Sequence, residues 1–181
     1  MNIDVHARNT KGETPLFVAF RNYNPELTKA AIEALFELGA DVNAMDNDGH
    51  FVFAGLQISS LGDPNISSFL EKMLAKMSKD VRQNVLLTLF KQGLSSKMYD
   101  SSGKGRLYED ELLWLKSRIE AQDLKKLDAI FVYSSNALSV QDFPFVFGKL
   151  GMDINAVDDN GNTLLHHIAE NNYRIKFNYL V

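Results

Sequence analysis

Two stretches of the chain, GADVNAMDNDG at residues 39–49 and GMDINAVDDNG at residues 151–161, are near copies placed 112 positions apart. Each begins and ends with glycine and is rich in Asp and Asn, the residues that favour turns. Neither has the apolar periodicity of a helix or the alternation of a core strand. A chain that contains the same loop twice is expected to repeat the structural unit around it.

The two copies share a frame, which is a glycine, an aspartate seven residues later and a second glycine three residues after that. The frame recurs at residues 93–103, and a partial form occupies residues 3–12. The closing glycines stand 37, 54 and 58 residues apart, and they are Gly12, Gly49, Gly103 and Gly161. An apolar residue follows each of them by four positions, namely Leu16, Phe53, Leu107 and Leu165.

Helical segments precede the loops. Residues 24–39 and 79–93 both end on a glycine, as helices commonly do. Apolar residues at helical spacing predict the core-facing side of each helix. In the first helix these are Leu27, Ala31, Leu35 and Leu38, and in the second they are Val81, Val85 and Leu89. Thr14 and Thr163 are placed to cap the helices that follow their loops.

This pattern resembles the ankyrin repeat, a β-turn followed by two antiparallel helices with a T-P-L-H-x-A signature. The match is carried by GETPLFVA at residues 12–19, GADVNA at 39–44 and GMDINAVDDNGNTLLHHIA at 151–169. The copy at 93–103 departs from the family, because GLSSKMYDSSG lacks the Val-Asn-Ala and Gly105-Arg106 replaces its Thr-Pro. By this resemblance, His166 occupies the place of a structural histidine that hydrogen-bonds a neighbouring loop.

The array is expected to be irregular, because a standard repeat has about 33 residues and the last two spacings are longer. Each surplus is enough for a further helix. Candidate helices lie at residues 63–77 and 79–93, and then at 108–121, 123–133 and 139–147. The expected fold is therefore all-α, an ankyrin-type helical solenoid with short β-hairpin loops and inserted helices. We expect one domain over residues 1–181, as a fragment of a longer protein, because a helical pattern at 174–181 runs to the last residue.

Composition narrows the function. The net charge is −4, from 19 basic and 23 acidic side chains, so no basic field for nucleic acid is expected. There is no cysteine, which excludes disulfides and thiolate metal sites. The N-terminal residues lack the apolar region of a signal peptide, and no apolar run is long enough to cross a bilayer. We expect a cytoplasmic protein that binds no membrane.

Catalysis has no recognisable motif here. The sequence contains no Gly-rich phosphate loop, no G-x-S-x-G and no H-E-x-x-H. His166 and His167 are adjacent, and neighbouring residues on a helix do not face the same way, so a joint metal site is not expected. We therefore expect no enzyme, no cofactor, no metal and no small-molecule substrate.

One stretch offers an alternative function. DSSGKGRLYEDE at residues 100–111 overlays the calcium loop of an EF-hand, with Asp100 at position 1, Gly105 at position 6 and Glu111 at position 12. Lys104 places a cation at position 5, where an oxygen ligand belongs, and no second hand is present to pair with it. A calcium-binding module thus remains the alternative, together with a targeting or scaffold segment of a larger enzyme.

The resemblance to ankyrin repeats implies a protein–protein interaction module whose partner lies across the loop tips and the concave face of the first helices. Divergent arrays with extra helices also resemble those in secreted effectors of intracellular bacteria, which would place the chain in a host-cell cytoplasm. The expected contacts at the loop tips are Met45, Asn47, Asp48, His50, Tyr99, Ser101, Lys104, Val157, Asp159 and Asn160. On the helices they are Val18, Arg21, His167 and Asn171.

Overall fold

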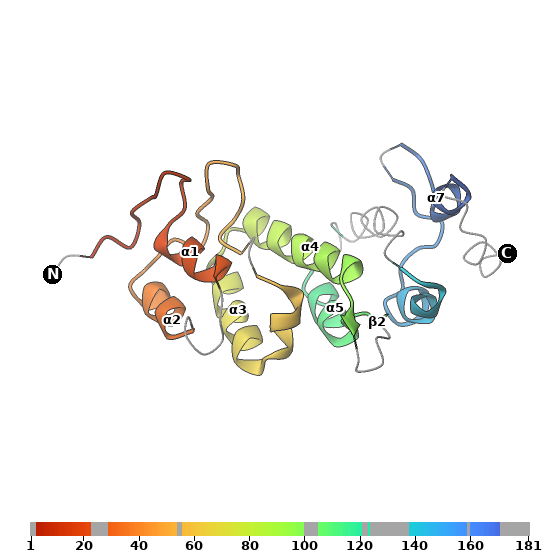
Figure 1. Ribbon diagram of the computed structural model, residues 1–181, viewed down its shortest axis with the longest axis horizontal. Coiled ribbons are helices and arrows are strands. Elements are labelled where there is room, and N and C mark those ends of the chain that lie inside the picture. Colours follow the sequence, from red (N-terminus) through yellow and green to blue (C-terminus); the bar gives the residue numbers. More distant parts are fainter. Residues whose placement is uncertain are drawn as a thin grey trace. The chain divides into compact units, whose positions relative to one another are not determined.

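A computed structural model describes residues 3–22, 29–53, 56–99, 105–120, 123, 138–158 and 160–170. The described chain is mostly helical, as the sequence predicts, with only two very short strands (Figure 1). Contacts divide it into two compact units, unit 1 at Met1–Thr88 and unit 2 at Leu89–Val181. The division falls inside helix α4 (Lys79–Ser95).

Unit 1 contains α1 (Pro15–Arg21), α2 (Lys29–Glu37), the 3-10 helix η1 (Ile58–Gly62), α3 (Pro64–Lys76) and the first part of α4. The start of α1 is the one predicted: Thr14 Oγ1 accepts the N–H of Phe17 at 3.3 Å, and Pro15 is the first helical residue. Pro is favoured there because its missing N–H would have no partner in the first turn. Helix α1 packs against α2.

The predicted core face of α2 is wrong. Ile32 is only 2% exposed, whereas Leu38 is 62% exposed and Ala31 lies on the surface. Leu35 is half-buried, and Leu27 lies outside the described residues. The helix is turned so that Ile32 is buried and the half-buried Phe36 meets Phe69 edge-on at 5.4 Å between ring centroids. The leucines of the predicted face are as large as Ile32, so contacts with neighbouring helices determine the orientation and side-chain size does not.

Helices α3 and α4 match the segments predicted at 63–77 and 79–93. The apolar positions predicted for 79–93 are buried, and in α3 the apolar residues at helical spacing are buried except Phe69, which is half-buried. The predicted end of α4 is wrong, because the helix continues through Gly93 to Ser95. Gly93 is buried inside the helix and Leu94 after it is fully buried, so another turn of packing carries the helix past the glycine. The frame at 93–103 therefore lacks its opening loop glycine.

Unit 2 continues from α4 into a small antiparallel pair, β1 (Met98–Tyr99) and β2 (Gly105–Arg106). Helix α5 (Glu109–Lys116) follows, and it is shorter than the predicted 108–121. Of the predicted helix at 123–133, only Asp123 is within the described residues. The unit ends in the 3-10 helix η4 (Val140–Asp142), the π-helix η5 (Pro144–Lys149) and α7 (Leu164–Glu170).

The helix predicted at 139–147 is replaced by η4 and η5. Pro144 has no N–H, so the 3-10 hydrogen bonds of η4 cannot continue through it. The chain then widens into a π turn, in which the Leu150 N–H reaches the Phe145 carbonyl at 2.7 Å. Phe145 and Val146 are buried. The sequence pattern thus located a helical segment correctly but not its hydrogen-bond type.

Two lysines hold η4 and η5 in unit 2. Lys97 Nζ lies 2.7 Å from Asp142 Oδ2 and 3.3 Å from Ser139 Oγ. Lys116 Nζ donates to the Leu150 carbonyl just beyond η5. A cation at the C-terminal end of a helix satisfies carbonyls that have no helical partner.

Candidate functional site

The repeated loops are the part of the chain that the sequence singles out. Loop 1 covers residues 3–14, loop 2 covers 39–51, and loop 3 covers 151–163 without residue 159, which is outside the described residues. Loops 1 and 2 belong to unit 1 and loop 3 belongs to unit 2.

All three loops contain the same turn. In each, one side-chain Oδ1 accepts the backbone N–H groups two and four residues later, as in an Asx turn. The acceptors and distances are Asn9 (2.9 and 3.0 Å), Asp46 (2.9 and 2.8 Å) and Asp158 (2.9 and 2.9 Å). The N–H of the closing glycine returns to the carbonyl of the same residue in every case, at 2.9, 3.2 and 2.9 Å. The repeat seen in the sequence is thus a repeat of hydrogen bonds.

A second turn precedes the first by five residues in each loop. Asp4, Asp41 and Asp153 each accept the N–H two residues later through Oδ1, at 2.9, 2.9 and 2.8 Å. The glycines of the frame have positive φ, from 61° at Gly151 to 86° at Gly39, a region that side chains disfavour. Single antiparallel bridges, Met45 with Phe51 and Val157 with Thr163, give loops 2 and 3 a minimal hairpin.

The second oxygen of each turn residue is held differently. Asp46 Oδ2 lies 3.1 Å from His50 Nδ1, and Asp158 Oδ2 lies 2.8 Å from His167 Nε2. In loop 1 the amide Nδ2 of Asn9 donates to Glu13 Oε2 at 2.7 Å. Glu13 is itself buried and is paired with Arg21.

The same contacts set the acidity of the two aspartates. Burial opposes ionisation of Asp46, but hydrogen bonds from His50 and from the Asp48 amide outweigh it and hold its pKa below the ordinary value. Burial likewise opposes ionisation of Asp158. Hydrogen bonds from Asn162, His167 and Asn160 outweigh it there and lower that pKa as well. Both turns are therefore built around ionised carboxylates.

Loops 1 and 2 stand side by side and are bonded to each other (Figure 1). Asn47 donates through its backbone N–H to the Lys11 carbonyl at 3.0 Å and through Nδ2 to the Thr10 carbonyl at 3.1 Å. In return, Arg8 donates to the Met45 carbonyl at 2.6 Å. A Cβ on Gly12 would lie 2.8 Å from the Asn47 backbone nitrogen, so only glycine allows this approach.

The expected contact residues differ in their exposure and in the contacts that they make within the chain. Exposed positions are Met45, Asp48, His50, Val157, Asn160 and Arg21, and Val18 is half-buried. Asn47 and His167 are committed to contacts within the chain, to loop 1 and to Asp158 respectively. Tyr99 lies in β1, whereas Ser101, Lys104, Asp159 and Asn171 lie outside the described residues.

Sequence reasoning missed the bonds that join loop 1 to loop 2 and to α1. Arg8, Asn47 and Glu13 carry these bonds, and none of them belongs to the repeated frame. The signal in the sequence was that Arg8 stands where loops 2 and 3 have the apolar residues Met45 and Val157.

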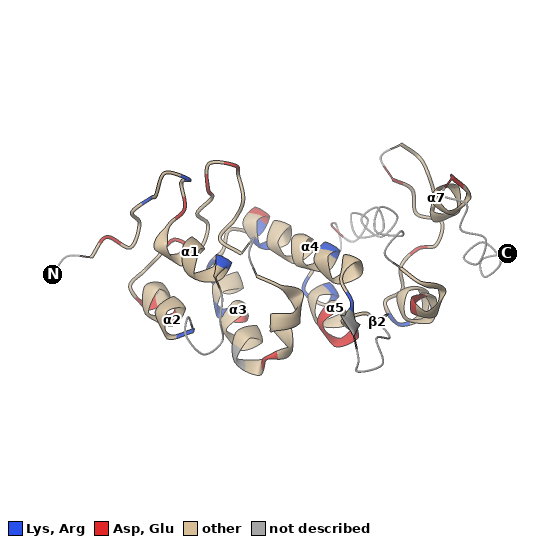
Figure 2. Ribbon diagram, in the orientation of Figure 1, with Lys and Arg blue, Asp and Glu red and all other residues tan. Residues whose placement is uncertain are grey.

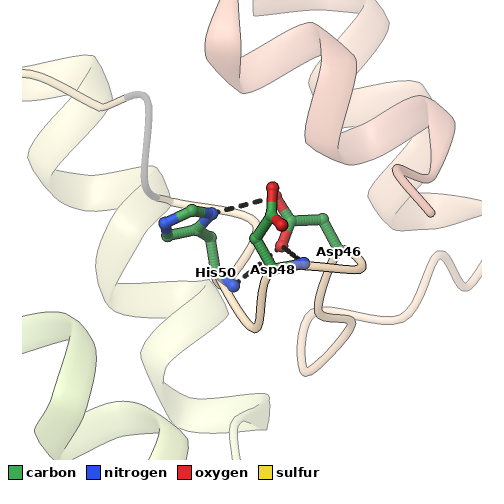
Figure 3. A group of neighbouring side chains, drawn as sticks. All are labelled: Asp46, Asp48 and His50. Atoms are coloured by element: carbon green, nitrogen blue, oxygen red, sulfur yellow. Dashed lines mark hydrogen bonds and ion pairs between the residues drawn. The ribbon is translucent and has the colours of Figure 1, made fainter. Parts of the chain in front are cut away.

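Asp46, Asp48 and His50 lie close enough to hold a metal ion, with one possible ligand atom from each within 4.8 Å of the others (Figure 3). Asp46 is nevertheless fully used by the turn, because Oδ1 takes two amides and Oδ2 takes the imidazole. The loop is satisfied without an ion. His166 and His167 likewise have separate partners, since His166 Nδ1 lies 2.9 Å from Thr163 Oγ1.

Ser139, Lys97 and Asp142 form a second polar cluster, in unit 2. The Ser139 hydroxyl donates to Asp142 at 2.8 Å, and the Ser139 backbone N–H donates to the same oxygen at 2.6 Å. Lys97 Nζ donates both to the buried Asp142 carboxylate and to Ser139 Oγ, so it is not positioned to accept the proton of the serine hydroxyl. The cluster caps η4 and does not make a nucleophile.

Comparison with known proteins adds no assignment: no family model matches the chain, and neither curated proteins nor solved structures give a match. Among the described residues, no helix combines the length and apolar character needed to cross a bilayer.

Proposed function

We propose that the chain is a protein–protein interaction module of the ankyrin-repeat type, without catalytic activity, cofactor or small-molecule substrate. The observation that carries the proposal is the threefold hydrogen-bond pattern of loops 1, 2 and 3. A turn repeated to this degree within one chain, with a helix before it in loop 2 and a helix directly after it in loops 1 and 3, is what a stacked helical repeat requires.

The binding surface that we propose is the joined tip of loops 1 and 2. Met45, Asp48 and His50 are exposed there, beside Thr10 and Lys11 of loop 1. The bonds made by Asn47 and Arg8 fix the two tips before any partner arrives. A surface that is already ordered loses less conformational entropy on binding, which favours affinity.

Charge supports a protein partner. Among the described residues of unit 1, Lys, Arg, Asp and Glu alternate along the loops and helices and form no continuous stretch of one sign (Figure 2). Nucleic acid is bound through a dense basic surface, whereas a protein interface tolerates mixed charges around an apolar centre. A cytoplasmic location, including a host-cell cytoplasm for a secreted effector, remains part of this proposal.

The test is a double substitution at the tip of loop 2, Met45→Ala with Asp48→Lys. Both side chains are exposed, so the fold should be retained while partner capture from cell extract falls at least tenfold. Asp80→Lys, at an exposed site on α4, makes the same change of net charge away from the loops and should leave capture unchanged. Thermal melts of all three proteins check folding. Equal capture by the loop variant and the wild type would remove the loop tips from consideration.

A further inference from the structure

Loop 3 contains the one place in the sequence where a glycine directly follows an asparagine, at Asn160 and Gly161. Such a pair is reactive, because glycine has no side chain to keep its backbone nitrogen away from the asparagine side chain. Asn160 is exposed, and no hydrogen bond holds its side-chain amide within the part of the chain that the structure describes. Water therefore has free access to this amide.

We infer that Asn160 is a site of spontaneous deamidation and that the turn of loop 3 controls its rate. In the first step the Gly161 nitrogen bonds to Cγ of Asn160 and loses its proton to water, while the side-chain nitrogen leaves as ammonia. This step closes a five-membered succinimide ring. Water then opens the ring at either of its carbonyls, and the product is aspartate or isoaspartate.

The turn restrains the first step because it holds the attacking nitrogen. The Gly161 N–H donates to the Asp158 carbonyl at 2.9 Å, and the Asn160 N–H donates to Asp158 Oδ1 at 2.9 Å. In a turn closed in this way, ψ of the residue before the last is about 0°. Ring closure requires the Gly161 nitrogen to rotate toward Cγ of Asn160, which breaks its bond to Asp158. The reaction thus proceeds from the opened turn, and its rate follows the population of that state.

Loop 2 shows how the aspartate product is accommodated. Asp48 stands at the position equivalent to Asn160, and the same turn forms there, with the Asp48 N–H donating to Asp46 Oδ1 at 2.9 Å (Figure 3). The aspartate product should therefore keep the turn and add a negative charge to the surface of loop 3. Isoaspartate lengthens the main chain by one carbon before the Gly161 nitrogen, so the geometry of the bond from Gly161 to Asp158 is lost.

The test follows residue 160 by peptide mass spectrometry while the intact chain is held in mildly alkaline buffer. The same chain unfolded in urea is the reference, and deamidation should be about tenfold slower in the folded chain, or slower still. Asp158→Ala removes the side-chain acceptor and should raise the rate in the folded chain severalfold. Asp158→Asn is the matched control, because an asparagine makes this turn in loop 1, and its rate should stay close to that of the wild type. Circular dichroism checks that both variants are folded.

Two outcomes would overturn the inference. One is an equal rate in the folded and unfolded wild type, or in the wild type and a folded Asp158→Ala protein, because the turn would then not control the reaction. The other is that neither aspartate nor isoaspartate forms at residue 160 in the unfolded chain, which would remove the site itself. If Asp158→Ala does not fold, the comparison of folded with unfolded wild type decides alone. None of these measurements involves a binding partner, so this inference and the proposed function can fail separately.

Discussion

The residue that accepts two backbone N–H groups in each loop is an aspartate in loops 2 and 3 and an asparagine in loop 1. The side chain that contacts it explains this difference. Asp46 and Asp158 face imidazoles, which favour a carboxylate. Asn9 faces Glu13, a buried acid, and donates to it through Nδ2. An aspartate in loop 1 would place two carboxylates together, which is unfavourable.

This difference predicts how the loops respond to acid. The folded-state pKa values of Asp46 and Asp158 lie below the unfolded value of about 3.9, so the unfolded chain binds more protons there. Their stabilising effect is present above about pH 4 and is lost as the pH falls through the folded values. Amide hydrogen exchange between pH 6 and pH 3 should show loops 2 and 3 losing protection before loop 1.

Asp158→Asn is the matched variant, because an asparagine makes this turn in loop 1. It should reduce the acid sensitivity of loop 3 and leave that of loop 2 unchanged. Equal loss of protection in loop 1 and in loop 3 would mean that the carboxylates do not control the turns.

The ion pair between Lys97 and Asp142 should contribute more to the free energy of unfolding than the exposed ion pair between Lys149 and Glu109. Both side chains are largely buried, so Lys97→Met leaves a buried carboxylate without its cation and should cost about 3–5 kcal/mol. Lys149→Met breaks an exposed pair with Glu109 and should cost about 0–1 kcal/mol. Urea unfolding of the two variants gives the comparison, and equal losses would contradict it.

At the scale of one element, α2 shows that a regular apolar stripe does not by itself determine which face of a helix is buried. Two faces of this helix are apolar, one with Ala31 and Leu38 and the other with Ile32 and Phe36. Periodicity describes both, because each repeats at helical spacing. Contacts with other helices of unit 1, such as the one between Phe36 and Phe69, then decide which face is turned inward.

Side-chain truncations on the two faces of α2 should have clearly different effects on the free energy of unfolding. Ile32→Ala removes a buried side chain and should lower the free energy of unfolding by about 2–5 kcal/mol. Leu38→Ala removes an exposed one and should change it by no more than about 0.5 kcal/mol. Leu35→Ala, at a half-buried site, should fall between them. Chemical denaturation measures all three, and a larger loss at Leu38 than at Ile32 would reverse the assigned face.

Across the whole molecule, features that depend on residues close in the sequence were predictable, and features that depend on distant segments were not. The turns of the loops were predictable because the hydrogen bonds that shape them join residues two to four apart, as at Asp46 and Asp158. Thr14 and the segments of α3 and α4 were predictable for the same reason. The end of α4 beyond Gly93 and the bonds of Asn47 to loop 1 depend on packing between distant segments. No local pattern encodes that packing.

The calcium alternative can be tested on the whole chain. Lys104 occupies a ligand position, and Gly105 and Arg106 pair with Tyr99 and Met98 in a hairpin. We therefore expect titration calorimetry with millimolar calcium to show no saturable heat. A micromolar site that disappears in Glu111→Gln would establish calcium binding instead.

The bonds between Asn47 and loop 1 have a consequence for anyone who rebuilds these loops. A library that randomises loop 2 alone would discard the anchor that loop 1 needs. One that changes Gly12 would push the backbone of loop 2 away. Residues 8–12 and 45–47 form one structural unit although they are far apart in the sequence. They should therefore be transplanted or diversified together. Loop 3 has an anchor of its own in His167 of α7, which should be moved together with it.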